Sequence, residues 1–284
     1  MKGAYPRTNA LSWEYDSCET SRTGGIVHHR LRGSNTNTAR GAAGFLTETF
    51  NRARTAGAAG PLTLRADSGF YTGAVAAACR RADVKFSITA KMSTAIRNKV
   101  TAITNNDWTA IAYFLDGADV AETVYRPFGN KAVELRLIVR RVKPTPGSQL
   151  ALFTDYSYHA MITDRIGETL ELEADHRRHA VIEDVIRDLK YGVGLNHMPS
   201  ARFGANAAWL GLNVIAHNLA RWTSRLGLQE TIITTDTLRR HHLRLPAQVT
   251  RSARRNTLHL PTRWPWREQF NTALARLHSI GIIT

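Results

Sequence analysis

The hydrophobic pattern of the chain alternates between helical and strand-like stretches. Apolar residues at helical spacing predict helices over residues 39–56 and 72–82 and a mainly helical stretch over 169–228. Short apolar runs predict strands over 61–66 and 84–89. Strands that alternate with helices favour a parallel sheet, which binds ligands at the carboxyl ends of its strands. We therefore expect an α/β fold.

Two further stretches have the composition of β-structure. Residues 10–32 alternate around a polar turn and predict a hairpin. Residues 108–166 are rich in β-branched and aromatic side chains and predict a mainly antiparallel β insertion. The predicted organisation is a first part of the core with the hairpin, a helix and a strand (1–107), the β-rich insertion (108–167), a helical completion of the core (168–228) and a basic carboxy-terminal segment (229–284).

The charge of the chain narrows the choice of partner. Its 284 residues include 38 Lys and Arg against 23 Asp and Glu, which gives a net charge of +15. This charge favours nucleic acid or another polyanion as the partner, although the preference for Arg over Lys is also typical of GC-rich genomes.

The two cysteines, Cys18 and Cys79, are too few for a disulfide framework or a four-ligand zinc site. Without a membrane-length apolar run or a secretory signal, we expect a cytoplasmic protein with no membrane partner.

Two carboxylates stand out as candidates for chemistry. Asp67 follows the strand predicted at 61–66, which we expect to be a central parallel strand, and ligands bind at the carboxyl ends of such strands in an open α/β sheet. An Asp before Ser-Gly is also a common turn former or helix cap. Glu183 lies on a helix predicted over 175–190. Its apolar stripe consists of Ile182, Val185, Ile186 and Leu189, and a second stripe on its flank consists of His176, His179, Glu183, Arg187 and Lys190. The alternative for the second stripe is a solvated face with a Glu183–Arg187 ion pair.

Several motifs in this order resemble the DDE transposases of bacterial insertion sequences. Residues 64–70 resemble the strand that carries the second aspartate of that family, and residues 176–190, with Glu183 and Lys190 separated by six residues, resemble its glutamate helix. Further similar blocks are the segments 194–200, 203–209 and 216–222 and the tail 258–266.

The resemblance implies an RNase H-like, retroviral-integrase-like mixed sheet with flanking helices, interrupted by a β insertion. It also implies DNA transposition by two-metal phosphoryl transfer, with Mg²⁺ as the usual ion and Mn²⁺ as a substitute. Asp67 and Glu183 would be the catalytic metal ligands, and Arg187 and Lys190 would contact the DNA backbone. The implied partners are double-stranded DNA, as terminal inverted repeats and target, and a second copy of the chain in a synaptic complex at the nucleoid.

The chain also departs from the family pattern. Members of the family have a first catalytic Asp on the opening strand of the core, and the present sequence begins after the position where that strand is expected. The sequence therefore predicts a transposase truncated at the amino terminus. Asp16 is a poor substitute for the missing first Asp, because its polar surroundings suit a turn. His176 and His179 stand where the family usually has Tyr and Arg, and they are candidate phosphate contacts. We expect weak or no strand transfer from this chain alone. The alternative is a non-catalytic DNA-binding transposase remnant.

Two other groups of residues complete the sequence predictions. A dense set of arginines predicts either a phosphate-binding surface or a plain solvated basic face; it comprises Arg239, Arg240, Arg244, Arg251, Arg254 and Arg255. A near-helical run of large apolar residues predicts a core stripe; it comprises Trp209, Leu212, Ile215, Leu219 and Trp222.

Overall fold

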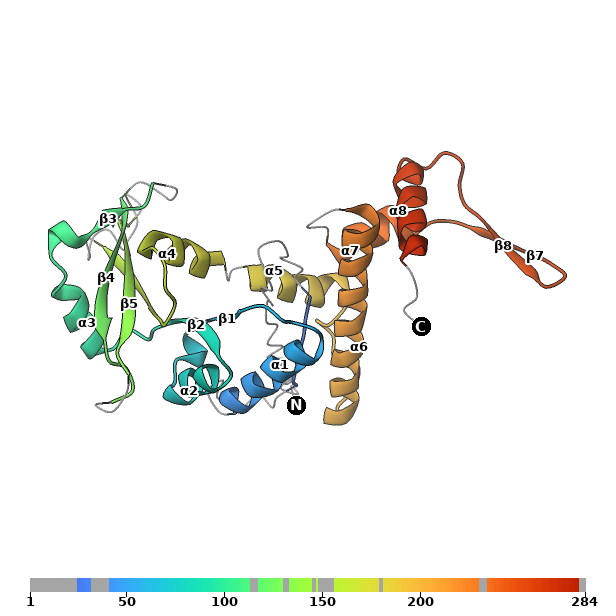
Figure 1. Cartoon of the computed structure of the whole chain (residues 1–284). Coiled ribbons are helices and arrows are strands. Elements are labelled where there is room, and N and C mark those ends of the chain that lie inside the picture. Colours follow the sequence, from blue (N-terminus) through green and yellow to red (C-terminus); the bar gives the residue numbers. More distant parts are fainter. Residues whose placement is uncertain are drawn as a thin grey trace. The chain divides into compact units, whose positions relative to one another are not determined.

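The computed structural model describes residues 25–31, 41–112, 117–129, 133–144, 147, 156–178, 181–229 and 234–280. These residues belong to two compact units (Figure 1). The sheet unit contains the described residues between 41 and 178. The helical unit contains residues 25–31 together with the described residues from 181 to 280.

A six-stranded mixed sheet forms the centre of the sheet unit, with the strand order β1-β2-β6-β5-β4-β3. Among the strands that the structure describes, only β1 and β2 run parallel, with Leu62 opposite Val84, and each of the remaining neighbours is antiparallel. The strands are β1 (Leu62–Ala66), β2 (Val84–Thr89), β3 (Thr109–Ala110), β4 (Ala118–Tyr125), β5 (Leu135–Val142) and β6 (Ser157–Thr163).

Four helices flank this sheet. They are α1 (Ala42–Thr55), α2 (Gly73–Arg81), α3 (Thr94–Thr101) and α4 (Thr169–Arg177). Helix α1 packs beside α2, which also contacts β2, whereas α4 packs on β4 and β5 (Figure 1). The hydroxyls of Thr72 and Ser93 accept hydrogen bonds from backbone N–H groups in the first turns of α2 and α3, which fixes where these helices begin.

The α/β fold class predicted from the sequence is confirmed. The helices expected over 39–56 and 72–82 are present, and the strands at 61–66 and 84–89 pair in parallel as expected. Antiparallel strands also occupy the β-rich stretch, where they continue the sheet of β1 and β2. Among the described residues β1 lies at one edge of the sheet, so Asp67 follows an edge strand and not a central one. The four predicted segment boundaries stay a prediction.

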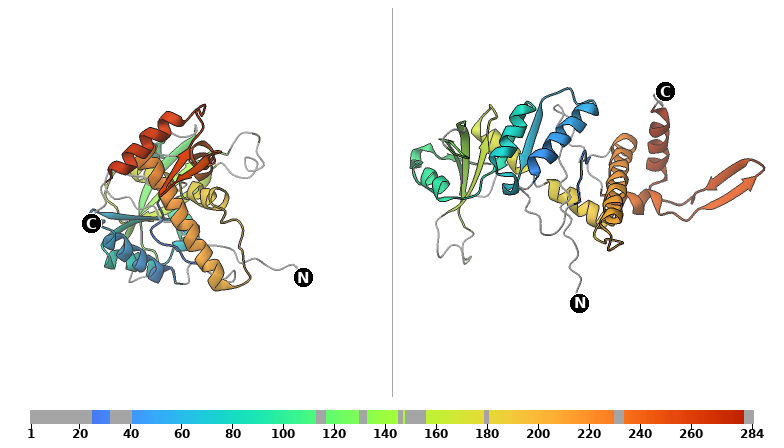
Figure 2. Two further views of the ribbon diagram at one scale, coloured as in Figure 1. Left: turned by 90° about the vertical axis from the view of Figure 1, so that its right-hand side faces the viewer. Right: turned by 90° about the horizontal axis from the view of Figure 1, so that it is seen from below.

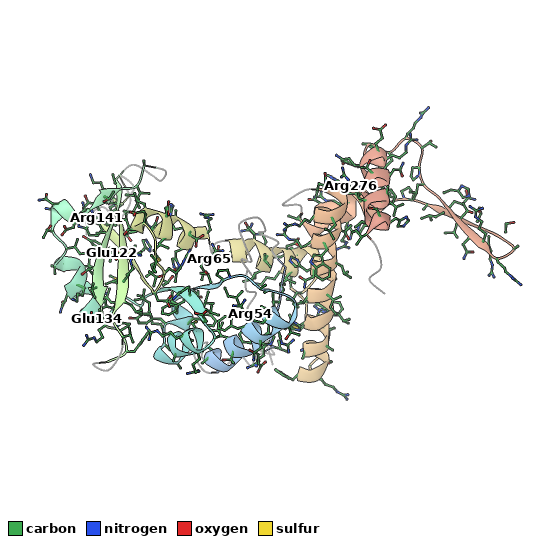
Figure 3. The ribbon with its side chains drawn as sticks, viewed as in Figure 1. Arg54, Arg65, Glu122, Glu134, Arg141 and Arg276 are labelled. Carbon is green, nitrogen blue, oxygen red and sulfur yellow. The ribbon has the colours of Figure 1, made fainter. Side chains whose placement is uncertain are left out.

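The helical unit is built from helices with π-helical ends and one small hairpin. Its elements are α5 (Val181–Arg187) with the π turn Asp188–Gly192, α6 (Phe203–Trp222) with the π turn Thr223–Leu228, α7 (Thr235–Leu238) with the π turn Arg239–Leu243, β7 (Gln248–Ser252), β8 (Arg255–His259) and α8 (Arg267–Ser279). Its core combines Ile26 and Leu31 with Val185, Leu189, Leu195, Leu210 and Val214. Arg276 on α8 donates a hydrogen bond to the Gly227 carbonyl oxygen (3.0 Å) and so ties α8 to the end of α6 (Figure 3).

Residues 25–31 were expected to form the second strand of a hairpin, and this part of the prediction is wrong. The segment has no strand pairing; instead, the Asn218 side chain accepts from the Ile26 N–H (2.8 Å) and donates to the Ile26 carbonyl (2.9 Å). An amide side chain therefore satisfies the backbone groups that a neighbouring strand would otherwise bind. The first half of the expected hairpin lies outside the described residues.

The core stripe predicted on α6 is also wrong. Trp209 is half-buried against the core, but Leu212, Ile215, Leu219 and Trp222 are 50–61% exposed. The buried stripe of α6 instead contains Asn206, Leu210, Asn213, Val214 and His217. Its polar members are accommodated by hydrogen bonds such as the one from Asn213 Nδ2 to the Trp209 carbonyl (2.8 Å). Helix α6 thus carries two stripes at helical spacing, and the more polar of the two faces inward.

This inverted arrangement predicts unequal costs for two similar substitutions. Leu210 is fully buried and Leu212 is 61% exposed on the same helix. Leu210→Ala should lower the free energy of unfolding by about 2 kcal/mol or more, because it leaves a cavity. Leu212→Ala should change that free energy by less than about 0.5 kcal/mol. Urea unfolding followed by circular dichroism measures both; equal losses would mean that Leu212 is packed after all.

Candidate functional site

Asp67 is held in a defined conformation directly after β1. It is exposed, and its Oδ1 accepts a hydrogen bond from the Gly69 N–H (2.8 Å), which caps the short turn Ser68–Phe70. The structure therefore bears out the capping role considered for this residue. A cap of this kind uses one carboxylate oxygen, and it fixes the direction of the group at the carboxyl end of the strand.

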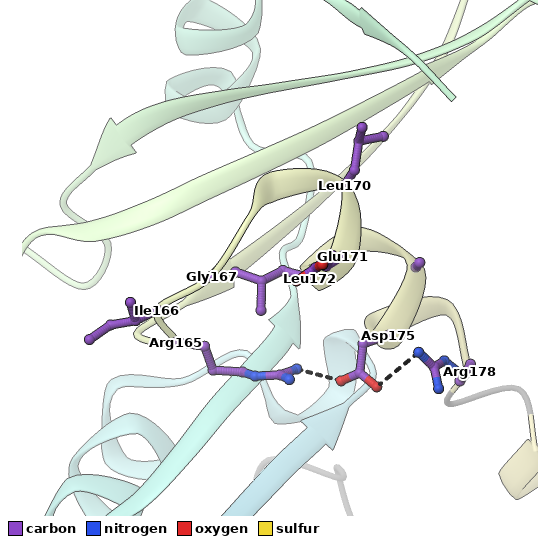
Figure 4. A pocket seen from close by; sticks show the side chains of 9 residues that line it. Arg165, Ile166, Gly167, Leu170, Glu171, Leu172, Asp175 and Arg178 are labelled. Carbon is purple, nitrogen blue, oxygen red and sulfur yellow. Dashed lines mark hydrogen bonds and ion pairs between the residues drawn. The ribbon is translucent and has the colours of Figure 1, made fainter. Parts of the chain in front are cut away.

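The end of α4 is tied to the same strand ends. Arg65, next to the last residue of β1, donates to the Asp175 carbonyl oxygen (3.0 Å) and to Asp175 Oδ1 (3.3 Å). Arg165 also donates to the Asp175 carboxylate, and Arg178 lies within 3.8 Å of it (Figure 4). Burial alone would raise the pKa of Asp175, but the arginines Arg165, Arg65 and Arg178 outweigh burial and lower this pKa.

His176 is part of this connection. Its side chain is buried, and Nε2 lies 3.0 Å from the Thr89 hydroxyl at the end of β2. A phosphate contact, as proposed from the sequence, would require this side chain to leave its buried position. His179 lies outside the described residues.

Glu183 is exposed on α5. Of the helix predicted over 175–190, the described residues form the end of α4, up to Arg177, and α5 from Val181 to Arg187; residues 179 and 180 lie outside the described residues. The apolar stripe is present where it is described: Val185 and Leu189 are buried. Arg187 pairs with Asp184 (2.8 Å) and not with Glu183, and that pair is two-thirds exposed. Lys190 is also exposed, so Glu183, Arg187 and Lys190 all reach solvent from this segment.

A buried carboxylate anchors the Glu183 segment, and the sequence predictions missed it. Asp188 Oδ2 lies 3.0 Å from His217 Nδ1 and accepts from the Thr235 hydroxyl (2.6 Å), while Oδ1 accepts from the Thr235 N–H (2.8 Å). Burial alone would raise the pKa of Asp188, but the hydrogen bonds from His217 and Thr235 hold it below the usual value. The signal in the sequence was the position of Asp188 beside Leu189 and three residues after Val185, on the buried stripe.

Gly192 makes room for this carboxylate. A Cβ atom at this position would collide with the Asp188 carboxylate and would lie 3.1 Å from the Thr235 Cβ. Only glycine therefore lets the π turn close over Asp188 without displacing it. The anchor joins the π turn that follows α5 to α6 and to the start of α7.

The remaining DNA-binding candidates, Arg254 and Arg255, lie on the β7–β8 hairpin and are exposed.

Asp67 belongs to the sheet unit and Glu183 to the helical unit, so their pairing around a metal ion stays a prediction. Within the described ranges, no group of three or more His, Cys, Asp or Glu side chains could hold a metal ion.

Comparison with protein families shows what kind of protein has this fold. The sequence matches the family Transposase DDE domain group 1 over residues 18–282. The chain therefore belongs to this family of DDE transposases. A comparison with curated proteins gave no match. None of the helices that the structure describes is long and apolar enough to cross a membrane.

Membership of the family has direct consequences for function. DDE transposases act in DNA transposition, which implies that DNA is bound as the substrate. The family generally uses divalent metal ions.

Proposed function

We propose that this protein cuts and joins DNA at the ends of an insertion sequence by two-metal phosphoryl transfer, with Asp67 and Glu183 as metal ligands. The family match carries the proposal. The structure supports it through Asp67, which is exposed at the carboxyl end of a strand that pairs in parallel. Ligands bind at such strand ends in α/β sheets.

The chemistry of the two side chains fits a hard divalent cation. Mg²⁺ prefers carboxylate oxygens and retains several water molecules, so it is often held by one or two carboxylates and the substrate phosphate. Asp67, directly after β1, and Glu183, on α5, are both exposed carboxylates, which suits this kind of site. Bound metal ions would activate the attacking hydroxyl and stabilise the leaving oxygen. Mn²⁺, which also favours oxygen ligands, is the expected substitute.

The connection between α4 and the strand ends offers further support. Asp175 and His176 are bound to the ends of β1 and β2, so α4 ends close to the strand that precedes Asp67. Glu183 follows six residues after the last residue of α4. Helix α4, the last described helix before Glu183 in the chain, therefore ends at the same end of the sheet as Asp67.

Exposed cations would hold the DNA. Arg187 and Lys190 are on the Glu183 segment, and Arg254 and Arg255 are on the hairpin; all four are exposed. Cations of this kind bind phosphates and release counterions, so they make affinity depend on salt. A dimer that pairs two transposon ends and a location at the nucleoid stay predictions.

The test of the proposed function uses the whole chain and duplex DNA that carries the matching terminal inverted repeats. We expect binding that weakens steeply as salt rises, and at most weak nicking or joining of the repeat ends in Mg²⁺ or Mn²⁺, as the sequence predicts. Cleavage that persists in EDTA would refute the metal mechanism. Salt-dependent binding without cleavage in either ion would favour the alternative, a non-catalytic DNA-binding protein. A DNA affinity that does not change with salt would exclude both the transposase and the non-catalytic DNA-binding protein.

A further inference from the structure

The β7–β8 hairpin is a two-stranded ribbon with no side chain in a core. Its register pairs Val249 with Leu258 and Ser252 with Arg255, and every residue of both strands is exposed. The ribbon extends away from the helices of its unit in Figure 1 and in the right-hand view of Figure 2. An isolated two-stranded ribbon is marginally stable in water. Contacts within the described residues therefore do not bury the side chains of this ribbon, and packing alone does not explain why the ribbon is there.

The base of the ribbon is held by aromatic contacts between the segments before and after it. The His241 ring stacks on the Trp266 ring, with centroids 3.9 Å apart and an interplanar angle of 11°. His242 is buried edge-on against Trp264, which in turn packs on Phe270 of α8. These contacts clamp both ends of the hairpin, so the helical unit presents the ribbon from a fixed base.

The two faces of the ribbon differ in chemistry. Alternate residues of a strand share a face with their paired partners. One face contains only side chains that donate or accept hydrogen bonds without negative charge; it consists of Gln248, Thr250, Ser252, Arg255, Thr257 and His259. Thr250 and His259 are already hydrogen bonded across it (2.9 Å). The opposite face carries the apolar pair of Val249 and Leu258, together with Arg251 and Asn256.

Charge identifies the partner as a polyanion. Arg251, Arg254 and Arg255 cluster at the tip, where Ala253 has a positive φ of 51° in the turn. Between Asp236 and Glu268 the sequence contains eight arginines and no acidic residue: Arg239, Arg240, Arg244, Arg251, Arg254, Arg255, Arg263 and Arg267. A stretch with this charge attracts phosphates along its whole length.

We propose that the β7–β8 ribbon enters the major groove of duplex DNA, with its polar face, which includes Arg255, toward the base edges and with Arg251 and Arg254 on phosphates. The major groove of B-form DNA admits a two-stranded ribbon, and arginine and amide side chains read bases there. The major groove of A-form RNA is too narrow for side chains to read. The inference rests on the proposed function, because it assigns to the β7–β8 ribbon the recognition of DNA that a transposase needs.

The test compares three forms of the whole chain on a 30-base-pair DNA duplex, a double-stranded RNA of the same sequence and a single DNA strand. The ribbon variant combines Arg251→Ala, Arg254→Ala and Arg255→Ala. Its matched control combines Arg80→Ala, Arg81→Ala and Arg97→Ala, which removes from the sheet unit three charges that are also exposed. We expect the ribbon variant to reduce the slope of log affinity against log salt by about 2, with a much smaller change in the control.

Groove occupancy is read by dimethyl sulfate, which methylates guanine N7 in the major groove. The wild-type chain should protect guanines on the duplex, and the ribbon variant should lose this protection while its thermal unfolding stays unchanged. Equal salt slopes for the wild type and the ribbon variant, unprotected guanines, or tighter binding to RNA would overturn the ribbon proposal. If the ribbon variant still cleaves terminal repeats as the wild type does, only the ribbon proposal fails. If the wild-type chain binds no duplex DNA, the proposed function fails with it.

Discussion

Glu183→Gln should reduce metal-dependent cleavage of terminal-repeat DNA by at least about a hundredfold. The amide removes the negative charge that would hold a divalent ion, and metal ions contribute several kcal/mol to stabilising the transition state of phosphoryl transfer. Asp67→Asn should have the same effect, and it retains the Oδ1 that accepts from Gly69. Cleavage rates in Mn²⁺ and direct measurement of Mn²⁺ binding provide two independent readouts.

The neighbouring residue supplies the control. Asp184 is 66% exposed on the same helix and pairs with Arg187. Asp184→Asn should leave cleavage and Mn²⁺ binding within about twofold of the wild type, because an exposed ion pair contributes little. Equal losses from Glu183→Gln and Asp184→Asn would reveal a general effect of charge on DNA binding, and the metal assignment for Glu183 would be wrong.

Asp188→Ala should lower the free energy of unfolding by about 3–5 kcal/mol. The substitution leaves His217 and two donors of Thr235 buried without their carboxylate, and losing one member of a buried polar group is costly. Asp184→Ala, four residues earlier and exposed, should cost less than about 0.5 kcal/mol. Urea unfolding at pH 7 compares the two variants.

The same carboxylate predicts a pH dependence. The pKa of Asp188 is lower in the folded protein than its usual value. Its contribution is therefore fully present above the pKa of the unfolded chain, near 4, and is lost as the pH falls through the lower folded value. The stability difference between the wild type and Asp188→Ala should shrink in acid. A difference that grows below pH 4 would contradict this sign.

The sequence predicted best those elements that local pattern determines. The order of α1, β1, α2 and β2 and the position of Asp67 at a strand end all follow from short apolar runs, Gly turns and cap residues such as Thr72. The edge position of β1 could not be predicted this way, because strand order depends on pairing between distant segments. The same limitation affected residues 25–31, whose backbone is bound by a side chain 192 residues away.

Helix α6 and Asp188 show where hydrophobic periodicity misleads. Both stripes of α6 have helical spacing, and a rule that buries the most apolar stripe selects the wrong one. The inward stripe is stable because Asn206, Asn213 and His217 have hydrogen-bonding or polar partners inside the helical unit. The partners of Asn206 and Asn213 are backbone carbonyls six and four residues earlier in the chain, whereas the partner of His217 is Asp188 in the π turn after α5, which becomes visible only in three dimensions. The partners of Asp188, His217 and Thr235, are likewise distant in the sequence, so the pattern around Glu183 did not indicate that Asp188 is the buried carboxylate of this segment.

The outward apolar stripe of α6 has a practical consequence for anyone who purifies this protein. Fluorescent dyes that bind exposed apolar surface are commonly used to diagnose partly folded states. Here the native helix already offers such a surface along Leu212, Ile215, Leu219 and Trp222. Dye fluorescence from a fresh preparation should therefore not be taken as a sign of misfolding unless near-ultraviolet circular dichroism is lost as well.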